Sequence, residues 1–201
     1  MQPNHKKHSL RFENMIQDID KIVIRCKNKD KRAQKKLYDI YAPVLFGICL
    51  RYAADRAEAE DILQESFTKI LIKISGFGDK GSFEGWMKRI VVNTAISNYH
   101  KNKKHNQTSD IDSVSDSFYQ ESEIWAQDFT PEELMKVINS LPTGYRTVFN
   151  LYAIEGFRHK EISEKLEIDV NTSKSQYSRA RKLIQSKLEK ISKINLDERK
   201  A

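Results

Sequence analysis

Basic side chains crowd the segment from 174 to 190, and their chemistry favours the binding of phosphates. Six Lys and Arg residues stand there against the single acid Glu189. Lys pairs with phosphate as a point charge, whereas Arg also presents a fork of donors that matches a guanine edge in the major groove of DNA. Tyr177, Ile184 and Leu188 recur at helical spacing, so the segment predicts an amphipathic helix with a basic side. The alternative interpretation is an ordinary solvated surface helix.

A second basic stretch, from Trp86 to Lys104, combines cations with aromatic and amide side chains. It contains no acid, and interleaved cations and aromatics are how proteins hold single-stranded nucleic acid. Asn93 lies among small apolar neighbours, and its amide can both donate to and accept from the edge of an unstacked base. The alternative is that these aromatic and amide residues serve only in a core and at helix ends. The cations of this stretch are Lys88, Arg89, Lys101, Lys103 and Lys104.

A polar face is expected on a helix around residues 61–67. Asp61, Gln64 and Glu65 recur at helical spacing there, opposite an apolar stripe. Such a face can bind a partner protein, although a solvated face is the ordinary interpretation of this pattern taken alone.

A glycine pattern raises the alternative of a nucleotide-binding enzyme. Gly76, Gly78 and Gly81 satisfy G-x-G-x-x-G, which cradles phosphates when it follows a strand. The preceding ILIKIS continues an amphipathic helical pattern instead, so we reject this interpretation.

Cys26 and Cys49 lack the spacing of a zinc site and are expected to be thiols. The histidines show no ligand spacing either, so the sequence predicts no catalytic residue, no metal site and no cofactor.

Charge and composition divide the chain and limit its class. The net charge of +7 and pI near 9.2 favour an anionic partner. Residues 105–130 contain six acids and no Lys or Arg, which is typical of a flexible linker.

No apolar run approaches the roughly 20 residues of a membrane span, and the first thirty residues lack a signal-peptide core. The cytoplasm is therefore the expected location.

Helical periodicity on both sides of this linker predicts an all-α fold with two small helical domains. The first domain has a helix that Pro43 bends or restarts, a helix that follows Asp55, and a helix that begins near Ser82 or Phe83. Together these three helices would position the polar face and the second basic stretch.

The second domain opens with Thr130, Pro131 and Glu133, the pattern of a capping box. Another helix should follow Pro142 and end at Gly156. The segment after that glycine resembles a helix-turn-helix, with a turn at 167–170 before the basic helix. Side chains expected inside this domain are Val148, Phe149, Tyr152 and Ile154, and Asn171 or Thr172 is expected to cap the basic helix.

Together these pieces resemble the extracytoplasmic-function (ECF) class of bacterial sigma factors, the promoter-specificity subunits of RNA polymerase. The resemblance rests on LYDIYAPVLFGICLRY, AEDILQESFTKI and SFEGWMKRIVVNTAISNY in the first domain. In the second domain it rests on INSLPTGYRTVFNLYAIEGFRHKEISEKL and NTSKSQYSRARK.

The resemblance implies a role for each group of residues. One group would bind core RNA polymerase, one would recognise and open the minus-ten element of promoter DNA, and one would read the minus-thirty-five element. It also implies an anti-sigma factor as partner, often one anchored in the membrane, and no small-molecule substrate. The implied residues are Asp61, Gln64 and Glu65 for the polymerase, Trp86, Lys88, Arg89 and Asn93 for the minus-ten element, and Lys174, Ser175, Ser178, Arg179 and Arg181 for the minus-thirty-five element.

Five positions depart from the pattern of this family. Glu167 stands in the turn where Gly is frequent, and Arg158 and His159 replace a small hydroxyl cap. Ser173 falls where an apolar residue is common, and Gln176 replaces a frequent Arg. These departures affect the packing of the motif and leave its base preferences unreadable.

The sequence as a whole predicts a non-enzymatic sigma factor. The expected organisation is an N-terminal extension (1–29), a region 2-like domain (30–104), an acidic linker (105–130), a region 4-like helix-turn-helix domain (131–192) and a tail (193–201). The alternative is a helix-turn-helix regulator that binds DNA as a dimer without core polymerase. That alternative leaves the polar face of Asp61 and the second basic stretch without a role.

Overall fold

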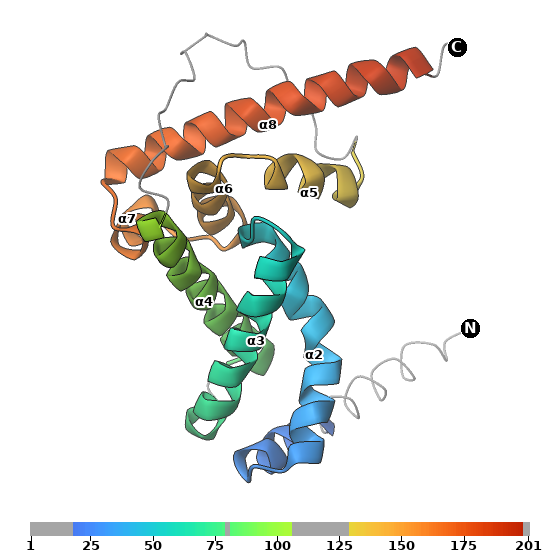
Figure 1. Ribbon diagram of the computed structural model, residues 1–201, viewed down its shortest axis with the longest axis vertical. Coiled ribbons are helices and arrows are strands. Elements are labelled where there is room, and N and C mark those ends of the chain that lie inside the picture. The colour runs from blue at the N-terminus through green and yellow to red at the C-terminus, as the bar shows by residue number, and fades with distance from the viewer. Residues whose placement is uncertain (1–17, 79–80, 106–128, 199–201) are drawn as a thin grey trace, which may run out of the picture. The chain divides into compact units, whose positions relative to one another are not determined.

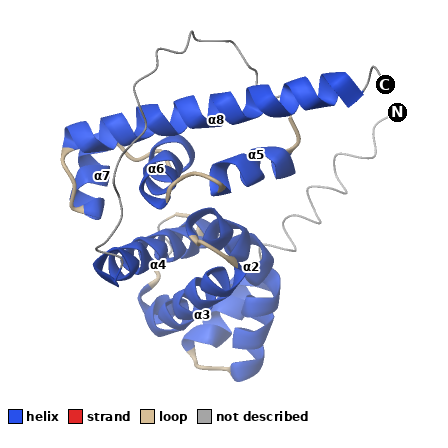
Figure 2. Ribbon diagram, turned by 45° about the horizontal axis from the view of Figure 1, so that its top comes forward, coloured by secondary structure: helices blue, strands red, loops and turns tan. Residues whose placement is uncertain are grey.

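The computed structural model describes residues 18–78, 81–105 and 129–198 (Figure 1). The described residues form helices and connecting turns with no strand among them (Figure 2), which confirms the predicted all-α class. They group into two compact units. The first holds 18–49 and 60–94, and the second holds 50–59, 95–105 and 129–198. The expected linker, 105–130, lies almost entirely outside the described residues, as does most of the N-terminal extension.

The first unit is built from a helix over 18–27 and parts of three longer helices. These are α2 (Lys31–Tyr52), α3 (Arg56–Lys73), which the short turn η1 (Ile74–Gly76) extends, and α4 (Phe83–His105). Each long helix gives one apolar side to a common core, because its apolar residues recur every three or four positions. The fully buried side chains include Leu37, Leu45, Ile70, Met87 and Val91.

Short polar side chains begin these helices, as the sequence predicted for Asp55 and Ser82. The Asp55 carboxylate accepts a 2.8 Å hydrogen bond from the amide of Glu58, and Ser82 Oγ accepts one of 3.3 Å from the amide of Gly85. Each side chain thereby satisfies an amide that has no partner within its helix. Pro43, in contrast, does not restart α2, which continues through it to Tyr52.

The glycine pattern does not follow a strand. The ILIKIS segment belongs to α3 and η1, so the strand that a dinucleotide-binding loop requires is replaced by helix here. The loop after η1 is held from the N-terminal side, since Lys27 Nζ donates a 2.9 Å hydrogen bond to the carbonyl oxygen of Phe77. This finding removes the structural basis of the enzyme alternative.

The second unit contains α5 (Pro131–Asn139), α6 (Thr143–Phe149), the π-helical turn η3 (Asn150–Ile154), α7 (His159–Leu166) and α8 (Val170–Glu198). The long α8 packs against α5, α6 and α7 (Figure 1). Two apolar clusters fill the contacts between α8 and the helices α5 and α6. Their buried members are Phe129, Val137 and Leu188 in one, and Leu141, Tyr145 and Ala180 in the other.

The predicted capping box is present at the start of α5. Thr130 Oγ1 accepts a 3.2 Å hydrogen bond from the amide of Glu133, and the Glu133 carboxylate accepts one of 2.8 Å from the amide of Thr130. Pro131 occupies the first helical position, where its missing amide costs nothing.

The expectation that Tyr152 and Ile154 are buried was wrong. Their exposed fractions are 38% and 40%, whereas Leu151 and Val148 are fully buried. The physical reason is η3, because a π-helical turn contains more residues than an α-helical one and rotates the residues that follow it.

Candidate nucleic-acid and polymerase interfaces

The helix-turn-helix predicted from the sequence is formed by α7 and α8. Ile162 and Leu166 of α7 are fully buried, and Glu167 ends α7 in the left-handed conformation, with φ 53° and ψ 50°. The amide of Ile168 then bonds to the carbonyl oxygen of Ser163 at 3.1 Å. Left-handed backbone at this point turns the chain from one helix into the next.

The expected cap of the basic helix was wrong by two or three residues. Helix α8 begins at Val170, so Asn171 and Thr172 lie inside it. The amide of Ser173 donates to the carbonyl oxygen of Asp169 at 2.9 Å, which makes Asp169 the residue that precedes the helix.

Most of the predicted minus-thirty-five residues lie on the open side of α8. Ser173 and Ala180 are fully buried, so the side chains on the opposite side face outward. Arg179 differs, because it is half-buried and its Nη1 lies 3.4 Å from the hydroxyl of Tyr145 in α6. The exposed members of the predicted set are Lys174, Ser175, Ser178 and Arg181.

Two further residues share this open side and were missing from the predicted set. Asn171 and Lys182 are exposed and stand four residues from Ser175 and Ser178, so the four form one stripe along the helix. Their spacing was visible in the sequence, but Asn171 was interpreted there as a cap. The stripe presents amide, hydroxyl and ammonium groups, all of which can donate hydrogen bonds.

A histidine links the two helices of this motif. His159 Nδ1 and Ser173 Oγ are 3.0 Å apart, and the imidazole stacks on Tyr152 with 4.3 Å between ring centroids. Tyr177 of α8 lies edge-on to the same ring at 5.9 Å. Burial among these rings, and then the charge of Lys174, lower the pKa of His159 below its ordinary value. The neutral imidazole therefore joins α7, η3 and α8.

The predicted minus-ten residues separate into two groups on α4. Trp86, Arg89 and Asn93 are spaced by three and four residues, which places them on one face, and Arg89 and Asn93 are exposed. Lys88 lies on another side of the helix. It is half-buried, and its ammonium pairs with the Glu84 carboxylate at 2.6 Å.

An aromatic cluster supports the exposed face of α4. Trp86 stacks on Phe83 with ring centroids 5.6 Å apart, and Phe77 lies 5.3 Å from the Trp86 ring. Tyr41 of α2 contacts the Phe83 ring edge-on at 6.0 Å. Aromatic rings in such a cluster hold one another in place and offer a face for base stacking. Phe77 was not among the predicted residues, because it falls in the glycine-rich loop and outside any periodic pattern.

The polar face of α3 has the predicted composition. Asp61 and Gln64 are exposed, and Glu65 forms a 2.7 Å ion pair with Lys69. Lys69 Nζ also reaches Thr94 Oγ1 in α4 at 3.2 Å, which holds this pair in place. At the far end of the same face Ile72 is 71% exposed. Acidic, amide and apolar groups thus share one surface, which suits a partner protein of complementary charge.

The two cysteines are buried thiols, as expected. Burial raises the pKa of Cys49 to about 12 and also raises that of Cys26.

In the part of the chain that the structure describes, no cluster of His, Cys, Asp or Glu is suited to a metal ion. None of the helices formed by the described residues has the length and apolar character that crossing a bilayer requires.

Comparison with known families and proteins agrees with this arrangement. The family model described as Sigma-70 region 2 matches residues 37–105, and the model described as Sigma-70, region 4 matches residues 132–184. The chain is 27% identical to the RNA polymerase sigma-H factor of Pseudomonas aeruginosa over 180 residues, which is 85% of this chain and 93% of the relative. It is 29% identical to the ECF RNA polymerase sigma factor SigW of Bacillus subtilis, over 85% of this chain and 96% of the relative.

The chain is also similar, at low identity, to two proteins that were solved as complexes. The sigma factor RpoE of Bartonella quintana, solved with the anti-sigma factor NepR, has 22% identity and a TM-score of 0.46. The match covers 77% of this chain and 96% of that one. CnrH, solved with the cytosolic domain of CnrY, has 18% identity and a TM-score of 0.44 over 84% of this chain and 95% of that one.

The chain belongs to the ECF subfamily of the sigma-70 family of RNA polymerase sigma factors. It is thus a subunit that binds core RNA polymerase and directs promoter-specific initiation of transcription. Its two matched domains are the all-α regions 2 and 4 of that family.

Proposed function

We propose that two exposed helix faces divide promoter recognition between them. Trp86, Arg89 and Asn93 on α4 would receive an unstacked base of the minus-ten element. Flipping a base costs a few kcal/mol of stacking, so a face that repays this cost only for the right base provides selectivity. The observation that carries this proposal is the shared, exposed position of Arg89 and Asn93 above the Trp86 ring cluster. Lys88 pairs with Glu84 on another side of α4, so it would not contact this base directly.

The minus-thirty-five element would be read by the open side of α8. Lys174, Ser175 and Ser178 are placed to reach base edges, and Arg181 is placed to reach phosphates. Arg179, which packs beside Tyr145, would contact DNA from the edge of this surface. The proposed DNA-binding domains span residues 30–104 and 131–192, joined by the acidic linker 105–130.

Core polymerase would bind the polar face of α3 through Asp61, Gln64 and Glu65. Exposed carboxylates steer association with a basic partner, and the exposed Ile72 adds apolar area beside them. A regulator that binds DNA as a dimer without polymerase would have no use for this face. We therefore assign these three residues to the binding of core polymerase.

The remaining parts of the proposal concern partners and place of action. We place the protein in the cytoplasm, where relatives of its family act on DNA, and assign it no catalysis of its own, since the polymerase supplies the chemistry. An anti-sigma factor, of the kind that is often anchored in the membrane, is the proposed regulator. Membership of the ECF subfamily supports this part of the proposal.

The polymerase face can be tested by charge reversal. Asp61→Lys combined with Glu65→Lys should abolish binding to purified core RNA polymerase, measured by co-migration in gel filtration, and leave the helical circular dichroism signal unchanged. Asp18→Lys combined with Asp20→Lys is the matched control, because both acids are exposed in the same unit but lie on the helix over 18–27, outside α3. Undiminished binding by the double variant would refute the assignment.

A further inference from the structure

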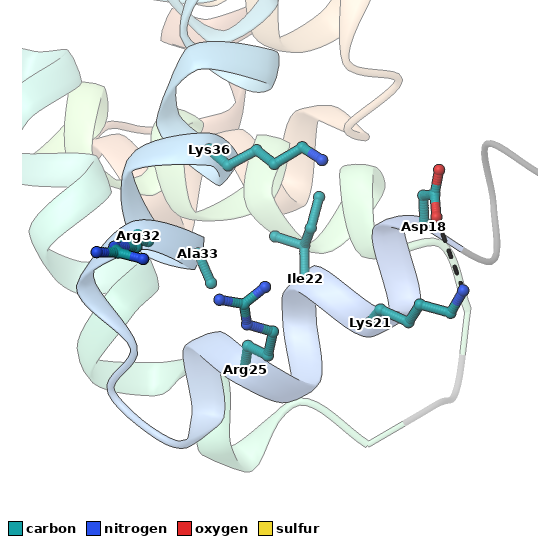
Figure 3. Close-up of a pocket in the computed structure, with 7 residues that line it drawn as sticks. All are labelled: Asp18, Lys21, Ile22, Arg25, Arg32, Ala33 and Lys36. Carbon is teal, nitrogen blue, oxygen red and sulfur yellow. Dashed lines mark ion pairs between the residues drawn. The ribbon is translucent and has the colours of Figure 1, made fainter.

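A cavity of about 330 Å³ lies in the first unit, between the helix over 18–27 and the beginning of α2. Figure 3 shows the side chains around it. All of its lining residues lie outside residues 37–105, the part of the chain that matches region 2. The lining residues are Asp18, Lys21, Ile22, Arg25, Arg32, Ala33 and Lys36.

Cations dominate this lining. Four of the seven residues are Lys or Arg, and Asp18 is the single acid among them. The Asp18 carboxylate is 3.8 Å from Lys21 Nζ, so this pair cancels one of the four positive charges and leaves an excess of cations. Clustered like charges repel one another, and a bound anion relieves that repulsion.

Two of the four cations are tied to acids and two are not. The Arg25 guanidinium bonds to the Asp30 carboxylate at 2.7 and 2.9 Å, which fixes Arg25 at the rim. The side chains of Arg32 and Lys36 have no acidic partner among the described residues. They stand four apart on α2 and both line the cavity. Figure 3 shows Lys36 extending over Ile22, with Arg32 on the other side of Ala33.

The floor of the cavity is apolar. Ile22 and Ala33 are 6% and 3% exposed, and the Asp30 carboxylate that holds Arg25 also accepts hydrogen bonds from the amides of Arg32 and Ala33 at 2.8 and 3.2 Å. The same carboxylate therefore caps α2 and positions the Arg25 guanidinium at the rim of the cavity. Small-ligand sites combine such a preformed concave floor with a few polar groups, and they begin at about 300 Å³.

We propose that this cavity is an oligophosphate-binding site, in which Arg32 and Lys36 contact the phosphate oxygens and Arg25 completes the rim. Arg presents several donors in a plane to phosphate, and Lys adds a point charge. The phosphates come either from a free oligophosphate or from the backbone of promoter DNA. The site goes beyond the promoter and polymerase contacts proposed above and does not depend on them.

The test uses the full chain and inorganic triphosphate as the probe, with binding measured by isothermal titration calorimetry. Arg32→Ala combined with Lys36→Ala should weaken binding at least tenfold. The matched control is Lys31→Ala combined with Lys35→Ala, which removes the same charge from the same turns of α2. Neither control residue lines the cavity, and Lys35 pairs with Asp39 at 2.6 Å. The control should stay within about twofold of the parent, since only general attraction is lost.

A second arm replaces triphosphate with short single-stranded and duplex DNA. A loss of triphosphate binding in the cavity variant identifies a free oligophosphate as ligand, and a loss confined to DNA identifies backbone phosphates. All four side chains are exposed, so thermal melting should be the same for both double variants. Equal affinities of parent, cavity variant and control for every probe would overturn the proposal, as would an equal loss in the two double variants.

Discussion

Ser173 Oγ lies 3.0 Å from His159 Nδ1, so a fully buried hydroxyl of the recognition helix α8 is bonded to the first residue of α7. A buried hydroxyl without a partner would cost about 1–3 kcal/mol. The pair thus accounts for two departures from the family pattern together, since His159 supplies the bond that a serine at position 173 requires. It also sets the position of α8 against α7, and with it the open side of the helix.

This pair makes the stability of the second unit depend on pH. The pKa of His159 is lowered in the folded state, first by burial and then by Lys174, from an ordinary 6.5. The unfolded chain then binds more protons near and below that value, so stability rises with pH and falls on acidification. We expect the melting temperature to drop less in His159→Gln than in the parent between about pH 7.5 and pH 5.5. An identical drop in both proteins would contradict this account.

The turn of the motif stores strain that glycine would remove. Glu167 adopts φ 53°, and left-handed backbone costs a residue with a side chain about 1 kcal/mol relative to Gly. Glu167→Gly should raise the free energy of unfolding by up to about 1 kcal/mol in urea titrations. Glu164→Gly, in the interior of α7, should instead lower it by about 1 kcal/mol. A decrease in both variants would show that Glu167 makes a contact worth more than the strain.

Arg179 tests how α8 reads the minus-thirty-five element. If the guanidinium bonds to a base, Arg179→Ala weakens the cognate duplex by about 1–3 kcal/mol and relaxes specificity at one position. We expect this result in fluorescence anisotropy with a panel of single-base variants. Lys190→Ala, an exposed cation farther along α8, is the control and should not alter specificity. A loss of the same size on every sequence would reassign Arg179 to a phosphate.

Asn93 tests the proposed minus-ten face. Asn93→Ala should weaken binding of a single-stranded minus-ten oligonucleotide by the holoenzyme by about 1 kcal/mol, because an amide bond to a base edge is lost. The control Asn28→Ala removes an exposed amide from the same unit. Filter-binding titrations compare the two. Equal affinities of the two variants would remove Asn93 from the base-binding surface.

Helix positions could be predicted from the sequence wherever a local rule decides them. Apolar spacing located α3 and α5, and the side-chain oxygens of Asp55 and Thr130 marked their starts. The helix-turn-helix followed from the buried spacing of Ile162 and Leu166. These predictions succeeded because capping and periodicity involve residues within one or two turns of each other.

Features that depend on tertiary packing could not be predicted in this way. The π-helical turn exposes Tyr152, although its spacing from Val148 predicts burial. The bond between His159 and Ser173 joins residues fourteen positions apart, and Phe77 joins the Trp86 cluster from a loop. Helical spacing alone indicates that Lys88 does not share a face with Asn93. The two were grouped together because the segment is rich in cations.

The most direct test of the sigma-factor mechanism is in vitro transcription with purified core RNA polymerase. A supercoiled template carries promoters recovered by sequencing the DNA that co-purifies with the protein from its native cell. The account predicts promoter-dependent transcripts when the chain is added to core enzyme, and their loss with Asp61→Lys combined with Glu65→Lys. Tight dimeric binding of the chain to the same duplexes, with no transcript above core enzyme alone, would contradict it.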